Sequence, residues 1–149
     1  MDALAQKMNL AELSTFLARE FPQAFGPQGA HRVEAVGPGT ARVRLTASER
    51  HLRPGGTVSG PAMMELADAA IYVAILGAIG PKALAVTTNL SINFLRKPVP
   101  GDIVADCRLL KLGKRLAVAE AEIRAEGSEE MVAHCVATYS IPPDRDDLP

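Results

Sequence analysis

Residues 61–77 read PAMMELADAAIYVAILG, the longest apolar run of the chain. Pro61 suits the first turn of a helix, where its missing N–H is not needed, and Ser59 or Gly60 can cap that turn. Apolar residues cover nearly every face of such a helix. A helix of this kind is buried, so we expect the rest of the chain to wrap around it.

Two carboxylates, Glu65 and Asp68, interrupt this apolar run. They make a membrane span a poor interpretation. A carboxylate on an otherwise apolar helix is costly unless it is paired or solvated by a cavity. Asp68 can therefore face solvent, bond to a buried backbone group, or act as a general base. Glu65 is its rival on nearly the same face, and Tyr72, four residues beyond Asp68, can donate a hydrogen bond to it or simply pack.

The remaining sequence predicts strands that could cover this helix. Polar and apolar residues alternate from 84 to 95, where Thr88 is expected to share a face with Leu90 and Ile92. Short turns join the last four segments, which predicts an antiparallel meander. The fold class is therefore α+β, with an antiparallel sheet curled around one long central helix. The predicted strands are 31–36, 40–46, 84–95, 102–111, 115–125 and 131–141.

The two ends of the chain are simpler. Within residues 1–25, the segment from 10 to 21 predicts one amphipathic helix, and Pro22 is expected to close it. Its apolar stripe consists of Leu10, Leu13, Phe16, Leu17 and Phe21. Residues 143–149 are polar, and we expect a frayed tail there. With 149 residues and no linker or repeat, we expect a single domain over residues 1–149.

Composition excludes several classes of protein. The net charge is −1 and aromatic residues make up 4%, which argues against nucleic-acid and polybasic membrane partners. Cys107 and Cys135 form no disulfide framework, and no Cys/His spacing indicates a metal site. We expect a cytoplasmic protein with neither a metal nor a redox cofactor.

Three stretches resemble the hotdog-fold acyl-CoA thioesterases of the phenylacetate-pathway type. Leu66-Ala67-Asp68 matches the second half of their helix motif, and Ser59-Gly60-Pro61 stands where His-Gly-Gly is usual. Residues 85–98 are similar to the family's strand ending in Phe-Leu-Arg-Pro. The third similar stretch is Gly101-Asp102 followed by residues 111–115. The likeness covers residues 30–142 and implies a hotdog fold.

The resemblance implies hydrolysis of an acyl-CoA to a carboxylic acid and free CoA. Asp68 would activate water or attack the thioester carbonyl, and the backbone N–H of Gly60 would polarise that carbonyl. It also implies a homodimer, often paired into a tetramer, with the helix start of one subunit facing the carboxylate of the other. Three positions depart from the family pattern: Ser59 replaces His, Pro61 replaces Gly, and Arg53 lies where many members have Asn.

Basic residues are concentrated in one block of the chain. Residues 81–125 hold eight basic and four acidic side chains, and we expect cations near the turns to meet the CoA phosphates. The candidates for catalysis are Asp68, Gly60 and Ser59. The candidates for substrate binding are Arg53, Thr57, Glu65, Tyr72, Thr88, Arg96, Lys97, Lys114 and Arg115.

Two alternatives remain open at this point. One is a non-catalytic module that binds acyl-CoA for regulation. The other is a hotdog hydratase or dehydratase, whose chemistry usually needs a histidine beside the carboxylate. Only His51 lies near the helix start, and we expect both His51 and His134 to be surface or strand residues.

Overall fold

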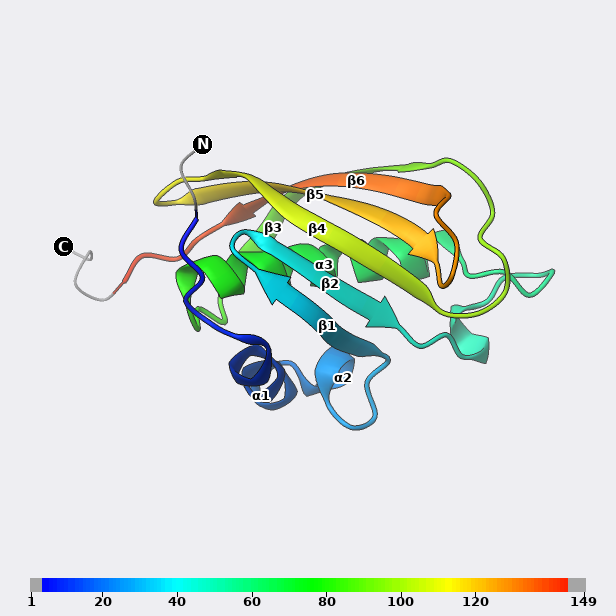
Figure 1. Ribbon diagram of the computed structural model, residues 1–149, viewed down its shortest axis with the longest axis horizontal. Coiled ribbons are helices and arrows are strands. Elements are labelled where there is room, and N and C mark those ends of the chain that lie inside the picture. The colour runs from blue at the N-terminus through cyan, green and yellow to red at the C-terminus, as the bar shows by residue number, and fades with distance from the viewer. Residues whose placement is uncertain (1–3, 145–149) are drawn as a thin grey trace.

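The computed structural model describes residues 4–144 and shows one curved sheet laid over a long helix (Figure 1). Its helices are α1 (Leu10–Glu20), α2 (Pro22–Phe25), the short 3₁₀ helix η1 (Glu49–His51) and α3 (Gly60–Ile79). Its strands are β1 (His31–Gly37), β2 (Thr40–Leu45), β3 (Val86–Phe94), β4 (Ile103–Leu112), β5 (Leu116–Ala125) and β6 (Met131–Ser140).

Helix α3 is the buried centre of the fold, as predicted. The Ser59 side chain caps it by accepting from Ala62 N at 3.3 Å, and Pro61 lies in its first turn. Gly80 ends it with a φ of +97°, a conformation that favours glycine. By length and composition α3 could cross a membrane, but 78% of its most apolar window is buried inside the fold. Its apolar surface is therefore used by the core.

All strand pairs are antiparallel, and the sheet order is β1-β2-β4-β5-β6-β3. This α+β arrangement around α3 is the predicted hotdog fold. The predicted meander of the last four strands is wrong for β3, which pairs with β6 instead of β4. Both edges of β4 are taken by β2 and β5, and the link at 95–102 contains Pro98 and Pro100, which favour an extended crossover.

Strand β3 lies at the edge of the sheet and carries a bulge. Its register against β6 shifts between Thr87 and Asn89. Because a bulge inserts one extra residue, it changes which side chains face inward. Thr88 is exposed and donates to the Thr138 carbonyl, whereas Thr87 turns toward α3. The prediction that Thr88 shares the inward face with Leu90 is therefore wrong.

The N-terminal segment holds two helices where one was predicted. Helix α1 begins at a capping box between Asn9 and Glu12 and ends at Glu20. As predicted, α1 ends just before Pro22, with Phe21 as its C-cap. Pro22 also starts α2, since proline is well tolerated at the first position of a helix. Leu10 and Phe21, both predicted on the buried stripe, are 40% and 38% exposed. The other three residues of the predicted stripe, Leu13, Phe16 and Leu17, are buried as expected.

The predicted frayed tail lies mostly outside the described residues. Residues 1–3 and 145–149 are not described. Asp144, the last described residue, forms an ion pair with Lys82 at 2.8 Å.

Candidate functional site

Asp68 is half-buried on α3 and is held by two hydroxyl groups from the sheet. Thr87 Oγ1 donates to its Oδ1 at 2.6 Å, and the Tyr139 hydroxyl donates to the same oxygen at 2.7 Å. The Tyr139 hydroxyl also lies 3.0 Å from the Asp68 carbonyl oxygen. Within residues 4–144, no group hydrogen-bonds to Oδ2. One carboxylate oxygen is thus anchored while the other is left open.

Tyr139 is buried beneath this carboxylate. Burial and the neighbouring Asp68 carboxylate raise the pKa of Tyr139, so its hydroxyl keeps its proton and remains a donor. Its ring stacks on Tyr72, with centroids 6.2 Å apart. Tyr72 donates its own hydroxyl to the Ala83 carbonyl at 2.8 Å. The hydrogen bond from Tyr72 to Asp68, weighed as one possibility from sequence, is therefore made by Tyr139.

A cavity of about 270 Å³ opens beside Asp68. It contains the candidates Glu65, Asp68 and Tyr72 together with Thr87 and Tyr139, which were not predicted. The rest of its wall is contributed by the α1–α2 junction, the loop before β3 and the start of β3. These further lining residues are Glu20, Phe21, Ala24, Ala69, Ala83, Ala85 and Val86.

The start of α3 forms a second hollow, of about 340 Å³, with a different set of candidates. Arg53, Thr57, Arg96 and Lys97 line it together with Gly60. A Cβ at Gly60 would lie 3.3 Å from the ring of Phe94, so glycine suits this close approach. No acceptor within the described part of the chain takes the Gly60 N–H, and the first N–H groups of a helix are free to bind an anion.

Gly60 and Asp68 do not meet within one chain. They are eight residues apart on one helix, which rises about 1.5 Å per residue, so their backbones lie about 12 Å apart. They also line separate hollows. Ser59 lies with Gly60 and uses its side chain as the helix cap. Two of the three catalytic candidates are thus at the helix start, and the third lies two turns further along.

The four candidate cations of the basic block are divided between two ends of the sheet. Arg96 and Lys97 follow β3 beside the helix start, and Arg96 pairs with Glu130 at 3.2 Å. Lys114 and Arg115 lie in the turn between β4 and β5. This turn is at the opposite end, because β5 and β3 both begin opposite Ser140. One chain does not bring these four side chains together.

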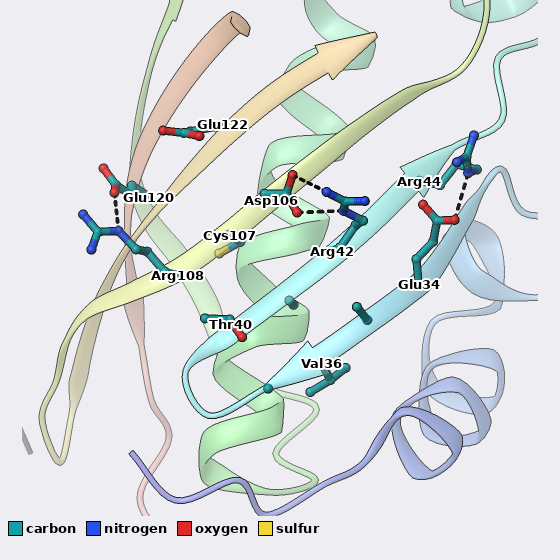
Figure 2. A pocket seen from close by; sticks show the side chains of 13 residues that line it. Glu34, Val36, Thr40, Arg42, Arg44, Asp106, Cys107, Arg108, Glu120 and Glu122 are labelled. Atoms are coloured by element: carbon teal, nitrogen blue, oxygen red, sulfur yellow. Dashed lines mark hydrogen bonds and ion pairs between the residues drawn. The ribbon is translucent and has the colours of Figure 1, made fainter. Parts of the chain in front are cut away.

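A third hollow, of about 740 Å³, lies on the other face of the sheet (Figure 2). Arg42 makes two hydrogen bonds to Asp106, at 2.8 and 3.0 Å, and Arg44 pairs with Glu34 at 3.2 Å. The acidic and basic side chains that line this hollow largely neutralise one another. Helix α3 lies behind the sheet in this view. We therefore do not assign the chemistry to this hollow.

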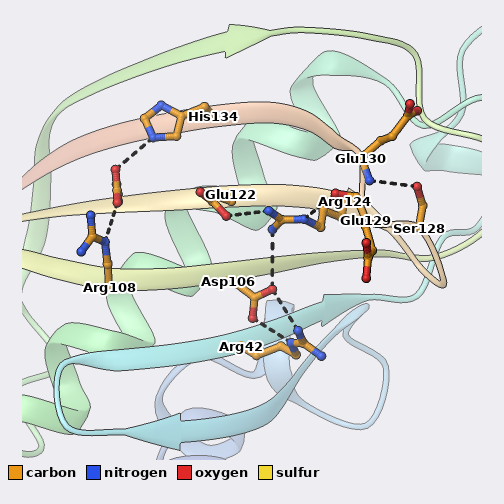
Figure 3. Close-up of polar contacts among 10 residues, drawn as sticks. Arg42, Asp106, Arg108, Glu122, Arg124, Ser128, Glu129, Glu130 and His134 are labelled. Carbon is orange, nitrogen blue, oxygen red and sulfur yellow. Dashed lines mark hydrogen bonds and ion pairs between the residues drawn. The ribbon is translucent and has the colours of Figure 1, made fainter.

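The same face continues as a network of ion pairs across β4, β5 and β6 (Figure 3). Arg124 pairs with Glu122 at 2.7 Å, and His134 lies 3.0 Å from Glu120. Hydrogen bonds from Arg108 and His134 lower the pKa of Glu120. His134 is a strand residue, as expected.

His51 is buried, contrary to the expectation that it lies on the surface or a strand. It ends the 3₁₀ helix η1, where its Nδ1 accepts from Ser48 N at 3.0 Å and its ring turns inward. Among the described residues, no histidine hydrogen-bonds to Asp68. The described residues also contain no group of three His, Cys, Asp or Glu side chains suited to a metal ion.

Comparison with known proteins places these features in a family. A sequence model of the thioesterase superfamily matches residues 55–132, which include α3 and β3. A candidate esterase of Pseudomonas aeruginosa is 32% identical over 101 residues, covering 67% of this chain and 74% of that protein.

Solved structures agree with this match. A candidate thioesterase of Silicibacter sp. TM1040 is 46% identical, with a TM-score of 0.86 over 95% of this chain and 97% of that one. The phenylacetic acid degradation protein PaaI of Thermus thermophilus, solved as a mutant, is 27% identical, with a TM-score of 0.66 over 76% of this chain and 94% of that one. The chain therefore belongs to the thioesterase superfamily and resembles its phenylacetate-pathway members.

Proposed function

We propose that this chain is an acyl-CoA thioesterase with Asp68 as its catalytic carboxylate. Family membership supports thioester hydrolysis as the general chemistry. The observation that carries the finer proposal is the asymmetry of Asp68. Its Oδ1 accepts from Thr87 and Tyr139, while Oδ2 is open beside a cavity. A carboxylate held in this way is oriented for attack or proton transfer.

Asp68 Oδ2 can act in either of two routes of thioester hydrolysis. In the first, Oδ2 takes a proton from water as the water oxygen bonds to the thioester carbon; the C–S bond then breaks and the proton passes to the CoA sulfur. In the second, Oδ2 itself bonds to the carbon, CoA leaves, and water cleaves the resulting anhydride. One turnover in ¹⁸O-labelled water tests the second route, because only that route can leave the label in Asp68, which happens when water attacks the Asp68 carbonyl of the anhydride.

The oxyanion of either route needs a hydrogen-bond donor, and the two hydroxyls beside Asp68, those of Thr87 and Tyr139, already donate to its Oδ1. The free N–H of Gly60 is suited to the role, but it lies about 12 Å along the same helix. We propose a homodimer in which the helix start of a second copy supplies this N–H, with Ser59 capping that helix. Pro61 contributes no N–H, so Gly60 is the donor that remains at this position. Pairing of two dimers into a tetramer remains part of the proposal.

The edge strand β3 supports pairing between copies. Its sequence, VTTNLSINF, contains no charged residue and no proline over nine residues. Natural edge strands are usually protected by charge, proline or a covering element. We propose that β3 pairs with the β3 of a second copy.

The coenzyme would lie along the hollow at the helix start. Arg53, Arg96 and Lys97 surround it, with Thr57 as a hydrogen-bonding neighbour. Cationic side chains of this kind favour phosphate groups. Lys114 and Arg115 lie at the other end of the sheet, so we propose that they take no part in the same phosphate site.

We further propose that the reaction needs neither a metal nor a redox cofactor, since Asp68 can supply the base. A cytoplasmic location fits the two free cysteines. Burial raises the pKa of Cys135 to about 12 and also raises the pKa of Cys107, so both remain unreactive thiols. The hydratase alternative is disfavoured because the hydrogen-bond partners of Asp68 are hydroxyls, with no histidine beside it.

The test is thiol release from a panel of acyl-CoAs by the wild type and two matched variants. Asp68→Asn keeps an oxygen that can accept from Thr87 and Tyr139, so the fold should survive while kcat falls at least ~100-fold. Asp106→Asn is the control: its carboxylate is on the outer face with Arg42, and kcat should stay within about twofold. Unchanged thiol release by Asp68→Asn contradicts the assignment. Acyl-CoA binding without thiol release by the wild type would indicate the non-catalytic module instead.

A further inference from the structure

The cavity beside Asp68 has one wall from outside the sheet and central helix. Glu20, Phe21 and Ala24, at the junction of α1 and α2, face Asp68 and Tyr72 across it. This junction is firmly held. Phe21 N donates to the Leu17 carbonyl at 2.8 Å, and the Phe21 carbonyl accepts from Phe25 N at 3.0 Å. The N-terminal helices thus position Phe21 as part of the cavity wall.

Phe21 differs from the other large side chains of this cavity. Tyr72 and Tyr139 are tied down through their hydroxyls, whereas Phe21 is held by ring contacts alone. Its ring lies edge-on to Tyr72 and Phe25, with centroids 6.3 and 6.0 Å away. It remains 38% exposed although it contacts these two rings. An exposed aromatic ring at a cavity that holds a carboxylate fits contact with an apolar ligand.

Four of the five aliphatic residues that line the cavity are alanines, and the fifth is Val86. Alanines at four positions leave the space that the cavity occupies: Ala24, Ala69, Ala83 and Ala85. A cavity of ~150 Å³ takes one benzene molecule, so 270 Å³ accommodates about ten carbon atoms. Phe21 bounds this space on the side away from the sheet. Removing its ring would open room for about six more carbons.

We propose that the cavity receives the apolar part of the acyl group and that Phe21 sets the longest acyl group accepted. This inference rests on the proposed thioesterase function and deepens it. The substrates would be CoA esters of short to medium acyl groups whose apolar part ends against Phe21. Phe21 is a specificity-determining residue here and takes no part in bond breaking.

The experiment measures kcat/KM for straight-chain acyl-CoAs from two to sixteen carbons. Each methylene buried in the cavity should raise kcat/KM about fourfold until the cavity is full. Phe21→Ala should move the optimum about four to six carbons longer, and Phe21→Trp should move it shorter. Leu10→Ala, equally exposed on α1 but away from the cavity, should leave the optimum in place.

Opposite shifts by the alanine and tryptophan variants separate a change in cavity length from mere loss of stability. Phe21→Leu gives a milder variant with an intermediate shift if the alanine variant does not fold. An unchanged optimum in an active enzyme overturns the role of Phe21. If the wild type releases no thiol at all, the proposed function fails. Calorimetric binding of straight-chain carboxylates to the same variants then tests Phe21 directly: a shifted length preference supports it, and an unshifted one overturns it.

Discussion

The two hydroxyls on Asp68 Oδ1 should contribute to the rate as well as to stability. Tyr139→Phe removes the donor at 2.7 Å and leaves Thr87 at 2.6 Å as the remaining anchor. A hydrogen bond to a charged group contributes about 1.5–3 kcal/mol. For a domain of this size, a loss of about 2 kcal/mol lowers Tm by about 4–8 °C. With one anchor gone, the carboxylate can rotate, and we expect kcat to fall about tenfold.

Removing both hydroxyls should have a larger effect. The variant carrying Tyr139→Phe and Thr87→Val has no donor on Oδ1, so kcat should fall about 100-fold, approaching Asp68→Asn. KM should change less than about threefold, because the cavity wall keeps its shape. Thiol release at saturating acyl-CoA gives kcat, and thermal denaturation gives Tm for each variant.

Thr88→Val is the matched control for Thr87→Val. It removes the hydroxyl of the adjacent threonine, which bonds to the Thr138 carbonyl on the exposed side of β3. Its kcat should remain that of the wild type. If the double variant loses stability but keeps kcat within twofold of the wild type, the hydroxyls are purely structural and the reasoning is wrong. An equal loss in Thr88→Val would point to general damage of the edge strand.

Charge and burial support three further predictions. Burial lowers the pKa of His31 below 6.5, so as the pH falls the unfolded chain takes up a proton before the folded chain does. The free energy of unfolding should therefore decrease below about pH 6.5. His31→Leu should reduce the difference in Tm between pH 7.5 and pH 5. Ser91→Lys places like charges together across a β3–β3 pair, so light scattering should detect monomers at concentrations where the wild type is a dimer. Arg96→Ala should raise KM for acyl-CoA severalfold but leave a thioester lacking the nucleotide unaffected, whereas Lys114→Ala should change neither value.

The fold was predictable where it depends on local pattern. Apolar residues cover nearly every face of the run at 61–77, which indicates a buried helix, and alternation indicates strands. The neighbour of each strand was not predictable in the same way. Periodicity says which face of a strand is buried, but pairing depends on which edges the other strands leave free. For this reason β3 was misplaced beside β4.

The residues of the candidate site also differ in whether local pattern alone could predict them. Asp68 was identifiable because a carboxylate inside an apolar helix needs a reason. Tyr139 was hidden because it continues the inward positions of Ala133, Cys135 and Ala137 and so resembles another core residue. A hydroxyl at the end of such a row of small side chains was the available signal. Thr87 gave no signal, because the bulge that turns it inward depends on the register with β6.

The position of Thr87 links the proposed catalytic carboxylate, Asp68, to the edge of the sheet. Thr87 belongs to β3, whose free edge is where we propose that a second copy binds, and its hydroxyl orients Asp68. Dimer formation and the orientation of the Asp68 carboxylate would then be thermodynamically coupled. By mass action, specific activity should rise with protein concentration through the range in which dimers form. Dilution would therefore act as a reversible off-switch for the enzyme.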